Sequence, residues 1–250
     1  MALAAPEKYA AIKQQIRDVF ARHRGRYGYR RITAVIRATG VSIDFKTIQR
    51  LMGQLGLKSL VRLKKYKSYK GGMGAVAPNH LARQFEAADV NEKWVTDVTE
   101  FKVPGGKVFL SPVMDLCNGQ IIAHTMDTRP SLGMVTSMLK KALAGLPQNA
   151  KPMVHSDQGW QYRMPLYQKL LEQSGLPQSM SRKGNCHDNA CIESFFAVLK
   201  SEYFHLNSFT SADELMKGLT EYIRYYNDER IKMKLNGLSP VAYRAQLAMR

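Results

Sequence analysis

Residues 94–127 read WVTDVTEFKVPGGKVFLSPVMDLCNGQIIAHTMD and carry a clear strand pattern. β-Branched and aromatic residues fill three runs, and two turn signals separate these runs, Pro104-Gly105-Gly106 and Asn118-Gly119. An Asn-Gly pair between apolar runs is a strong hairpin signal. The pattern therefore predicts three consecutive antiparallel strands, over residues 94–101, 107–116 and 120–127.

Helices and strands alternate after this meander. Apolar spacing predicts a helix, a strand, a helix, a very short strand and a helix, over residues 131–145, 152–156, 164–174, 178–180 and 189–204. Three antiparallel strands followed by this alternation make an α/β layer fold. The order resembles the ribonuclease H fold. Two more helices are predicted at 211–228 and 239–249, on either side of a basic loop with Arg230, Lys232 and Lys234.

The amino-terminal third has a purely helical pattern. Helices are predicted over residues 7–24, 29–38 and 46–55. The last two, joined by a short connection, match a helix-turn-helix unit whose second helix carries Lys46, Gln49 and Arg50. With Arg30 and Arg31, these side chains are the predicted DNA contacts of this region. A three-helix structural core would give the same apolar pattern, and the local charge favours the DNA-binding interpretation.

Charge is unevenly distributed along the chain. Residues 1–74 hold seventeen Lys and Arg against three Asp and Glu, a net charge of +14, whereas residues 75–250 have a net charge of only +3. This asymmetry indicates a module that binds a polyanion, joined to a nearly neutral body. A basic solvated surface, or a ribosomal type of protein, is the alternative that charge alone leaves open.

Residues 58–74 are predicted to form a basic linker. Their Lys and Arg residues, interleaved with two tyrosines, suit a segment that lies along phosphates. The predicted DNA contacts here are Arg62, Lys64, Lys65 and Lys67. A solvated tether with no DNA contact is the equal alternative.

Three carboxylates are candidates for a shared site. Asp97 is predicted within the first strand, Asp157 at the end of the fourth, and Glu193 in the first turns of the helix over 189–204. In this layout the first strand is central and the fourth pairs beside it, so the acids can converge. Converging carboxylates raise one another's pKa, and divalent cations remove that cost. Oxygen ligands suit Mg²⁺ or Mn²⁺, and two such ions activate and stabilise the oxygens of phosphodiester displacement.

Other acids compete for the same role, because residues 75–250 contain seventeen. Asp115, Asp127 and Asp188 are the alternatives. Asp115 lies near a hairpin end, which favours a structural role. Asp188 could instead cap the helix that follows it.

Three sequence blocks carry a family resemblance. They are Trp94–Thr99 (WVTDVT), His155–Gly159 (HSDQG), and Asp188-Asn189 leading into Glu193–Phe196 (ESFF). Together they resemble the integrase core of insertion-sequence transposases, and most closely the second-reading-frame product of two-frame bacterial elements. Thirty-five residues separate Asp157 from Glu193, as in retroviral-integrase-like enzymes. Lys200, seven residues after Glu193, matches a basic residue that contacts DNA in that family.

The resemblance implies a reaction and partners. The reaction is hydrolysis that frees a 3′-hydroxyl at the element's end, followed by attack of that hydroxyl on another phosphodiester. The implied ligands are double-stranded DNA and two Mg²⁺ or Mn²⁺ ions on Asp97, Asp157 and Glu193. A homo-oligomer on DNA is also implied. Such families often make a frameshift fusion with an upstream reading-frame product, a part that this chain is expected to lack.

The resemblance and the charge pattern together predict four regions. These are a helix-turn-helix region over 1–57, a basic linker over 58–89, a ribonuclease H-like catalytic core over 90–206 and a helical extension over 207–250. Alternatives to a transposase are a ribonuclease H-type nuclease that does not join strands and an inactive DNA-binding regulator. The intact acidic triplet with Lys200 argues against the inactive form.

The remaining signals concern location and other sites. Neither a signal peptide nor an apolar run of about 18 residues is present, and the odd number of cysteines shows no disulfide framework. The chain is therefore expected in the bacterial cytoplasm, associated with the nucleoid. Cys186, His187 and Cys191 lack a second ligand pair for zinc. Cys191 is expected to be buried, and His155 is either a phosphate-orienting group or a packed strand residue.

Overall fold

The computed structural model describes residues 9–61, 76–182 and 185–249. It divides into two compact units. The helical unit holds Met1–Leu63 together with Ile231–Leu238, and the sheet unit holds Lys64–Arg230 together with Ser239–Arg250. The four regions predicted from the sequence stay a prediction. The two compact units follow different boundaries, because residues 231–238, predicted as part of the helical extension, belong to the helical unit.

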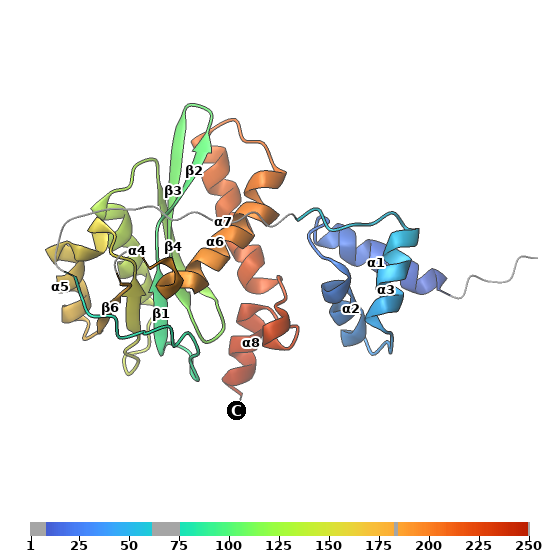
Figure 1. The fold of residues 1–250 in the computed structure, drawn as a ribbon, viewed down its shortest axis with the longest axis horizontal. Helices are drawn as coiled ribbons and strands as arrows, with labels where there is room; N and C mark the ends of the chain where they lie inside the picture. The colour runs from blue at the N-terminus through green and yellow to red at the C-terminus, as the bar shows by residue number, and fades with distance from the viewer. Residues whose placement is uncertain (1–8, 62–75, 183–184, 250) are drawn as a thin grey trace, which may run out of the picture. The chain divides into compact units, whose positions relative to one another are not determined.

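The sheet unit is built on one mixed sheet (Figure 1). Its strands are β1 (Lys93–Thr96), β2 (Thr99–Val103), β3 (Gly106–Asp115), β4 (Ile121–Asp127), β5 (Met153–Ser156) and β6 (Gln178–Met180). β3 pairs antiparallel with β1, β2 and β4, while β5 runs parallel to both β1 and β6. The predicted meander is confirmed, and so is the pairing of the first and fourth predicted strands.

The predicted strand over 94–101 is interrupted at Asp97-Val98. β1 and β2 pair with β3 in one unbroken register, with Thr96 opposite Val113 and Thr99 opposite Leu110. That register brings Pro112 opposite Asp97, and proline has no amide hydrogen to donate. Within this interruption the amide of Val98 donates to Oδ1 of Asp97 at 2.7 Å. The prediction of one continuous strand over 94–101 was therefore wrong at Asp97, one of the three candidate acids.

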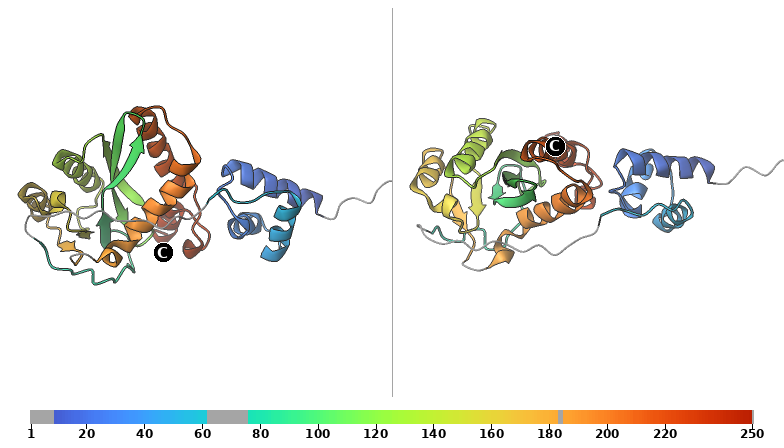
Figure 2. Two further views of the ribbon diagram at one scale, coloured as in Figure 1. Left: turned by 45° about the horizontal axis from the view of Figure 1, so that its top comes forward. Right: turned by 90° about the horizontal axis from the view of Figure 1, so that it is seen from above.

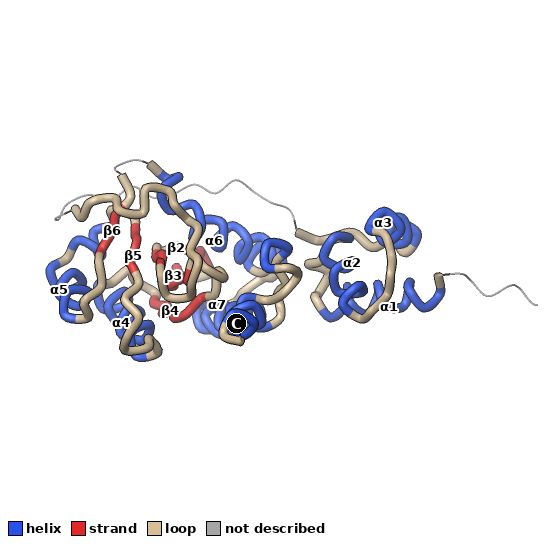
Figure 3. The backbone as a smooth tube through the Cα atoms, turned by 90° about the horizontal axis from the view of Figure 1, so that it is seen from below, coloured by secondary structure: helices blue, strands red, loops and turns tan. Residues whose placement is uncertain are grey.

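Helices cover both faces of the sheet, as Figures 2 and 3 show. The helices of this unit are α4 (Leu132–Ala144), α5 (Pro165–Gln173), α6 (Ala190–Glu202), α7 (Ala212–Asp228) and α8 (Pro240–Leu247). Short 3₁₀ helices lie at Trp160–Arg163 (η1), Cys186–Asn189 (η2) and Phe204–Leu206 (η3). α4 and α5 pack on the face that holds Trp94, and α6 and α7 on the face that holds Val95. This division follows from the alternation of side chains along a strand.

Polar contacts hold the last helices to the β3–β4 hairpin. The Asn227 side chain on α7 exchanges two hydrogen bonds with the backbone of Ile121, both 2.9 Å long. Arg244 on α8 forms an ion pair with the buried Asp115 at 3.1 Å. Asp115 also accepts hydrogen bonds from the amides of Asn91 and Cys117. The structural role predicted for Asp115 is thereby confirmed.

The helical unit contains α1 (Ala10–Arg22), α2 (Tyr29–Ala38) and α3 (Phe45–Gln54). Apolar residues from all three form its core, among them Ile16, Ile32 and Ile48. Asp44 begins α3 by accepting a hydrogen bond from the amide of Lys46 at 2.8 Å, as an N-cap residue does. The three predicted helices are confirmed, with ends that differ by at most two residues wherever the structure describes them; residues 7 and 8 of the first predicted helix lie outside the described residues.

A remote segment completes the helical unit. The amide of Ile231 donates to the hydroxyl of the fully buried Tyr27 at 2.9 Å. Within this segment, η4 (Met233–Leu235) is closed by a β-bridge between Lys232 and Leu238. The predicted basic loop of Arg230, Lys232 and Lys234 is therefore shared between the units, since Arg230 belongs to the sheet unit. No helix in the described ranges is long and apolar enough to cross a membrane.

Candidate active site

Asp97 and Asp157 leave two neighbouring parallel strands at the same end. β1 and β5 are paired up to Thr96 opposite Ser156, and each acid is the next residue of its chain. Both carboxylates are partly buried. The parallel register therefore fixes the two acids side by side, in agreement with the layout expected from the sequence.

A tight turn holds the Asp157 carboxylate. The amide of Gly159 donates to Oδ1 of Asp157 at 2.8 Å. A Cβ atom at position 159 would lie 2.8 Å from that same oxygen and 2.9 Å from Oε1 of Gln161. Only glycine fits here without moving the carboxylate. Gly159 was not among the residues predicted to form the site, although an acid followed two residues later by glycine is a common turn signal.

Glu193 lies in the first turn of α6 and is partly buried. The start of this helix is tied to β1, because Nδ2 of Asn189 donates to the carbonyl of Thr96 at 3.2 Å. Thr96 directly precedes Asp97. The third acid thus comes from a helix that is attached beside the first acid, which the sequence alone could only suggest.

Asp188 has a different role from the one expected. The N-cap residue of α6 is Asn189, and no side chain caps the helix. The Asp188 carboxylate is instead bound by Arg83 and Arg182, each at 2.9 Å, and accepts a hydrogen bond from Nδ2 of the Asn79 side chain. These contacts hold its pKa well below the usual range, with the Arg182 hydrogen bond as the largest cause. The possibility of a capping role for Asp188 was wrong, because its carboxylate binds Arg182, six residues earlier, and Arg83, 105 residues earlier.

The three candidate acids influence one another electrostatically. Burial raises the pKa of Asp97 well above its usual range, and the negative charges of Asp157 and Glu193 raise it further. Burial is also the main cause of the raised pKa of Asp157 and of Glu193, and Asp157 adds to the latter. Within the described ranges, no Lys or Arg lies in ion-pair contact with any of the three. The cluster therefore holds excess negative charge, which Lys200 near Asp97 and Arg163 near Asp157 offset in part without forming an ion pair.

This donor set fits a divalent cation chemically. Carboxylate oxygens are the ligands that Mg²⁺ and Mn²⁺ prefer, and a bound cation would reverse the raised pKa values. In the ranges that the structure describes, no three His, Cys, Asp or Glu side chains meet in an arrangement that holds a metal as it stands. Binding a metal ion would thus require the three carboxylates to move closer together. Glu193 is best able to move, because it is partly exposed and its side chain is flexible.

Lys200 lies to one side of this cluster of acids. It is partly buried on α6, and its Nζ is 5.2 Å from the ring centroid of Phe101. Burial lowers its pKa, while the charges of Glu100 and Asp97 act in the opposite direction. Lys200 therefore lies in the electrostatic fields of Glu100 and Asp97, and the DNA contact predicted for it stays a prediction.

His155 is a packed strand residue. It is fully buried, and its ring nitrogens lie 2.9 Å from Oγ of Ser179 and 3.1 Å from Oγ of Ser181. Burial lowers its pKa to about 4. Of the two roles considered from the sequence, the structural one is confirmed. Cys191, expected to be buried, is only partly so.

The predicted DNA contacts of the helical unit lie mostly on its surface. Arg30, Lys46, Gln49 and Arg50 are exposed, while Arg31 is partly buried with its guanidinium 5.3 Å from the Tyr27 ring centroid. Their role in DNA binding stays a prediction. The linker contacts predicted at Arg62, Lys64, Lys65 and Lys67 lie outside the described residues.

Known families match nearly the whole chain. Residues 87–186 and 193–247 match models described as "Integrase core domain", and residues 7–65 match one described as "HTH-like domain". A protein named as a transposase, InsK of insertion sequence element IS150 in Escherichia coli strain K12, is 52% identical over 99% of this chain and 88% of its own length. An uncharacterized transposase-like protein of Haemophilus influenzae is 50% identical over 82% of this chain and 95% of its own.

Solved structures agree on the fold. The catalytic core domain of HTLV-2 integrase, in complex with magnesium, matches with a TM-score of 0.50 and 16% identity. The match covers 62% of this chain and 96% of that domain. At this identity the likeness shows the ribonuclease H-like fold alone, whereas the two relatives show the family. The chain belongs to the insertion-sequence transposases that combine a helix-turn-helix-like domain with an integrase core.

Proposed function

We propose that this transposase cuts the ends of its insertion sequence and joins the freed 3′-hydroxyl to another DNA strand. The site proposed for both steps is formed by Asp97, Asp157 and Glu193. The observation that supports it is the concentration of negative charge at these acids, whose pKa values are all raised. Two of them leave paired strands side by side, and no Lys or Arg in the described ranges forms an ion pair with any of the three.

The proposed cofactors are two Mg²⁺ or Mn²⁺ ions. When bound, they would supply the positive charge that activates a hydroxyl and stabilises the leaving oxygen in phosphodiester displacement. Asp97, Asp157 and Glu193 would hold these ions through their carboxylate oxygens. The magnesium complex of the HTLV-2 integrase core is in accord with this choice.

The residues of the chain itself would position the DNA. Lys200, beside Asp97 on the neighbouring helix, can neutralise a phosphate next to the reacting one. Gly159 keeps the Asp157 carboxylate in place through its amide. The exposed cations of the helical unit, Lys46 and Arg50, are proposed to bind the element's ends in the manner of a helix-turn-helix domain.

The proposed setting is the bacterial cytoplasm, on nucleoid DNA. Holding two DNA ends together requires more than one active site, so we propose a homo-oligomer on DNA. An upstream reading-frame product is a further proposed partner. Each of these rests on the family of the chain and not on its geometry.

The test is cleavage and joining of a labelled duplex that carries the element's own end, with Mg²⁺ or Mn²⁺. Wild type is compared with Glu193→Gln, which keeps the size of the side chain but removes its charge. Joined product from wild type alone is the expected result. Nicks without joining would point to a nuclease, or to a need for the upstream partner. DNA binding with no metal-dependent product would point to a regulator.

A further inference from the structure

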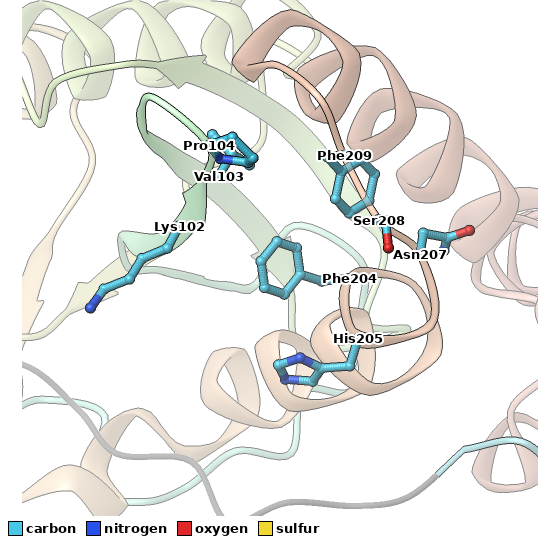
Figure 4. A pocket seen from close by; sticks show the side chains of 8 residues that line it. All are labelled: Lys102, Val103, Pro104, Phe204, His205, Asn207, Ser208 and Phe209. Atoms are coloured by element: carbon cyan, nitrogen blue, oxygen red, sulfur yellow. The ribbon is translucent and has the colours of Figure 1, made fainter.

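A hollow of about 410 Å³ opens in the sheet unit, between the tip of the β2–β3 hairpin and the segment after α6 (Figure 4). Val103, Phe204 and Phe209 provide its apolar surface. Lys102, His205 and Asn207 provide polar groups around it. None of the residues assigned so far to the reaction lines this hollow, although it is large enough for a nucleotide-sized ligand.

The chemistry of the lining selects for an anion with a flat apolar part. All residues that line the hollow are neutral or basic, with Lys102 exposed at the rim, and no carboxylate faces it. Asn207 is held in place, because its Nδ2 donates to the carbonyl of Tyr203. The rings of Phe204 and Phe209 are nearly parallel, at 8°, with centroids 5.8 Å apart. A cationic rim beside aromatic faces is the combination that binds a nucleotide through its phosphate and its base.

A continuous series of contacts leads from this hollow to the candidate active site. Phe204 packs edge-on against Phe101, with ring centroids 5.1 Å apart. The ammonium group of Lys200 also lies against Phe101, 5.2 Å from its ring centroid. Lys200 shares α6 with Glu193 and lies in the electrostatic fields of Glu100 and Asp97. Phe101 itself is buried, so these contacts place Lys200 and the aromatic pair against the same ring, and a DNA strand that passes Lys200 comes close to the hollow.

We propose that this hollow binds an unpaired nucleotide of the DNA strand that lies in the active site. This inference rests on the proposed function, since it extends the DNA path beyond the acids. Stacking between neighbouring base pairs covers the faces of bases inside a duplex, so a base that has left the duplex is the one best able to stack on Phe204 or Phe209. Stacking on these rings is tolerant of sequence, because every base has an aromatic face. The hollow would thus select for a frayed or single-stranded end without reading its sequence.

The test is a comparison of two DNAs with equal numbers of phosphates, a blunt duplex and a duplex with a short single-stranded 3′ extension. Binding to the full chain is measured by fluorescence anisotropy in EDTA, so that no strand is cut. Wild type is expected to bind the extended DNA about tenfold more tightly, as one stacked base allows. Phe209→Leu, which keeps an apolar side chain against Tyr203 and Phe204, should reduce this preference to less than about twofold.

A second variant and a matched control separate stacking from charge. Lys102→Ala should weaken binding of the extended DNA and lower its salt slope by about one. Lys140→Ala removes the same charge from an exposed position on α4, on the opposite face of the sheet, and should leave the preference intact. Crosslinking of wild type to 5-iododeoxyuridine in the extension should label the peptide that holds Phe204 and Phe209. This crosslinking measurement uses wild type, so it does not depend on whether a variant folds.

Three results would overturn the inference. The first is that wild type shows no preference for the extended DNA. The second is that Phe209→Leu keeps the preference while the crosslink falls on another peptide. Loss of self-association in Phe209→Leu, with the DNA preference unchanged, would assign the hollow to a protein contact. In each case, metal-dependent joining that is lost in Glu193→Gln would leave the proposed function standing. Failure of that joining with the DNA preference intact would reject only the proposed function.

Discussion

Two regions of the sheet unit hold buried or partly buried acids, and they treat negative charge in opposite ways. In the first region each acid has an arginine: Arg244 binds Asp115, Arg83 and Arg182 bind Asp188, and Arg230 binds Glu202. In the second region, Asp97, Asp157 and Glu193 influence one another, and in the described part of the chain no ion pair reaches them.

The difference separates acids that stabilise the fold from the acids that we propose as ligands of a cation. An isolated buried charge is costly, so a structural acid is found with its partner already in place. Acids that bind a metal have their partner supplied from outside, and the apo protein carries the cost as raised pKa values. Neutralising a carboxylate should therefore have opposite effects on stability in the two regions.

The largest expected effect is that of Asp97→Asn on catalysis. Strand joining should fall by roughly a thousandfold or more, because a proposed metal ligand loses its charge. The free energy of unfolding should stay the same or rise by about 1 kcal/mol, since a like-charge repulsion is removed. Joining assays and urea unfolding at pH 7 measure the two. A clear loss of stability would place Asp97 with the structural acids.

Removing the charge of Glu202 should instead lower the free energy of unfolding. Its carboxylate accepts two hydrogen bonds from Arg230, at 2.7 and 2.8 Å, and one from the hydroxyl of Tyr222. Both members of the ion pair are buried, so Glu202→Gln alone should cost about 3 kcal/mol of unfolding free energy by leaving the guanidinium unpaired. Adding Arg230→Met should restore much of the loss. If the single and double variants are equally unstable in urea, the comparison between the regions fails.

Mg²⁺ should stabilise the protein only through the second region, which holds Asp97, Asp157 and Glu193. With free Mg²⁺ at a hundred times its dissociation constant, the wild-type protein should gain about 2.7 kcal/mol of unfolding free energy. Asp97→Asn should gain much less, while the Glu202→Gln/Arg230→Met protein should gain as much as wild type. Thermal unfolding with and without Mg²⁺, with Ca²⁺ as a comparison ion, checks this. An equal gain in all three proteins would mean that Mg²⁺ binds elsewhere.

The smallest of these effects concerns the turn that supports Asp157. In Gly159→Ala the new methyl group would lie against Oδ1 of Asp157 and Oε1 of Gln161, so the carboxylate must shift. A shift of this kind should reduce strand joining by about a hundredfold. Gly106→Ala, at a position with no neighbour within 4 Å of a Cβ, is the matched control. Unchanged joining in Gly159→Ala, with the fold intact by circular dichroism, would show that the position of Asp157 is not critical.

Much of the fold followed from local sequence signals. The turns at Gly105-Gly106 and Asn118-Gly119 define the meander, and the apolar periods define the helices. The interruption at Asp97 was missed, because a strand propensity says nothing of the residue opposite, and here that residue is Pro112. The role of Asp188 was missed for a similar reason, since Arg83 comes from a segment 105 residues away.

By itself, the sequence determined the family, the order of elements and the three candidate acids, since those depend on residue type and spacing along the chain. Only the tertiary structure decided which acids receive an arginine, because ion pairs such as Arg244–Asp115 join residues 129 apart and follow no sequence period. It also decided that Ile231–Leu238 completes the helical unit, through the buried hydroxyl of Tyr27. A buried polar group accepts whichever partner the folded chain brings within reach, and that choice is made by packing.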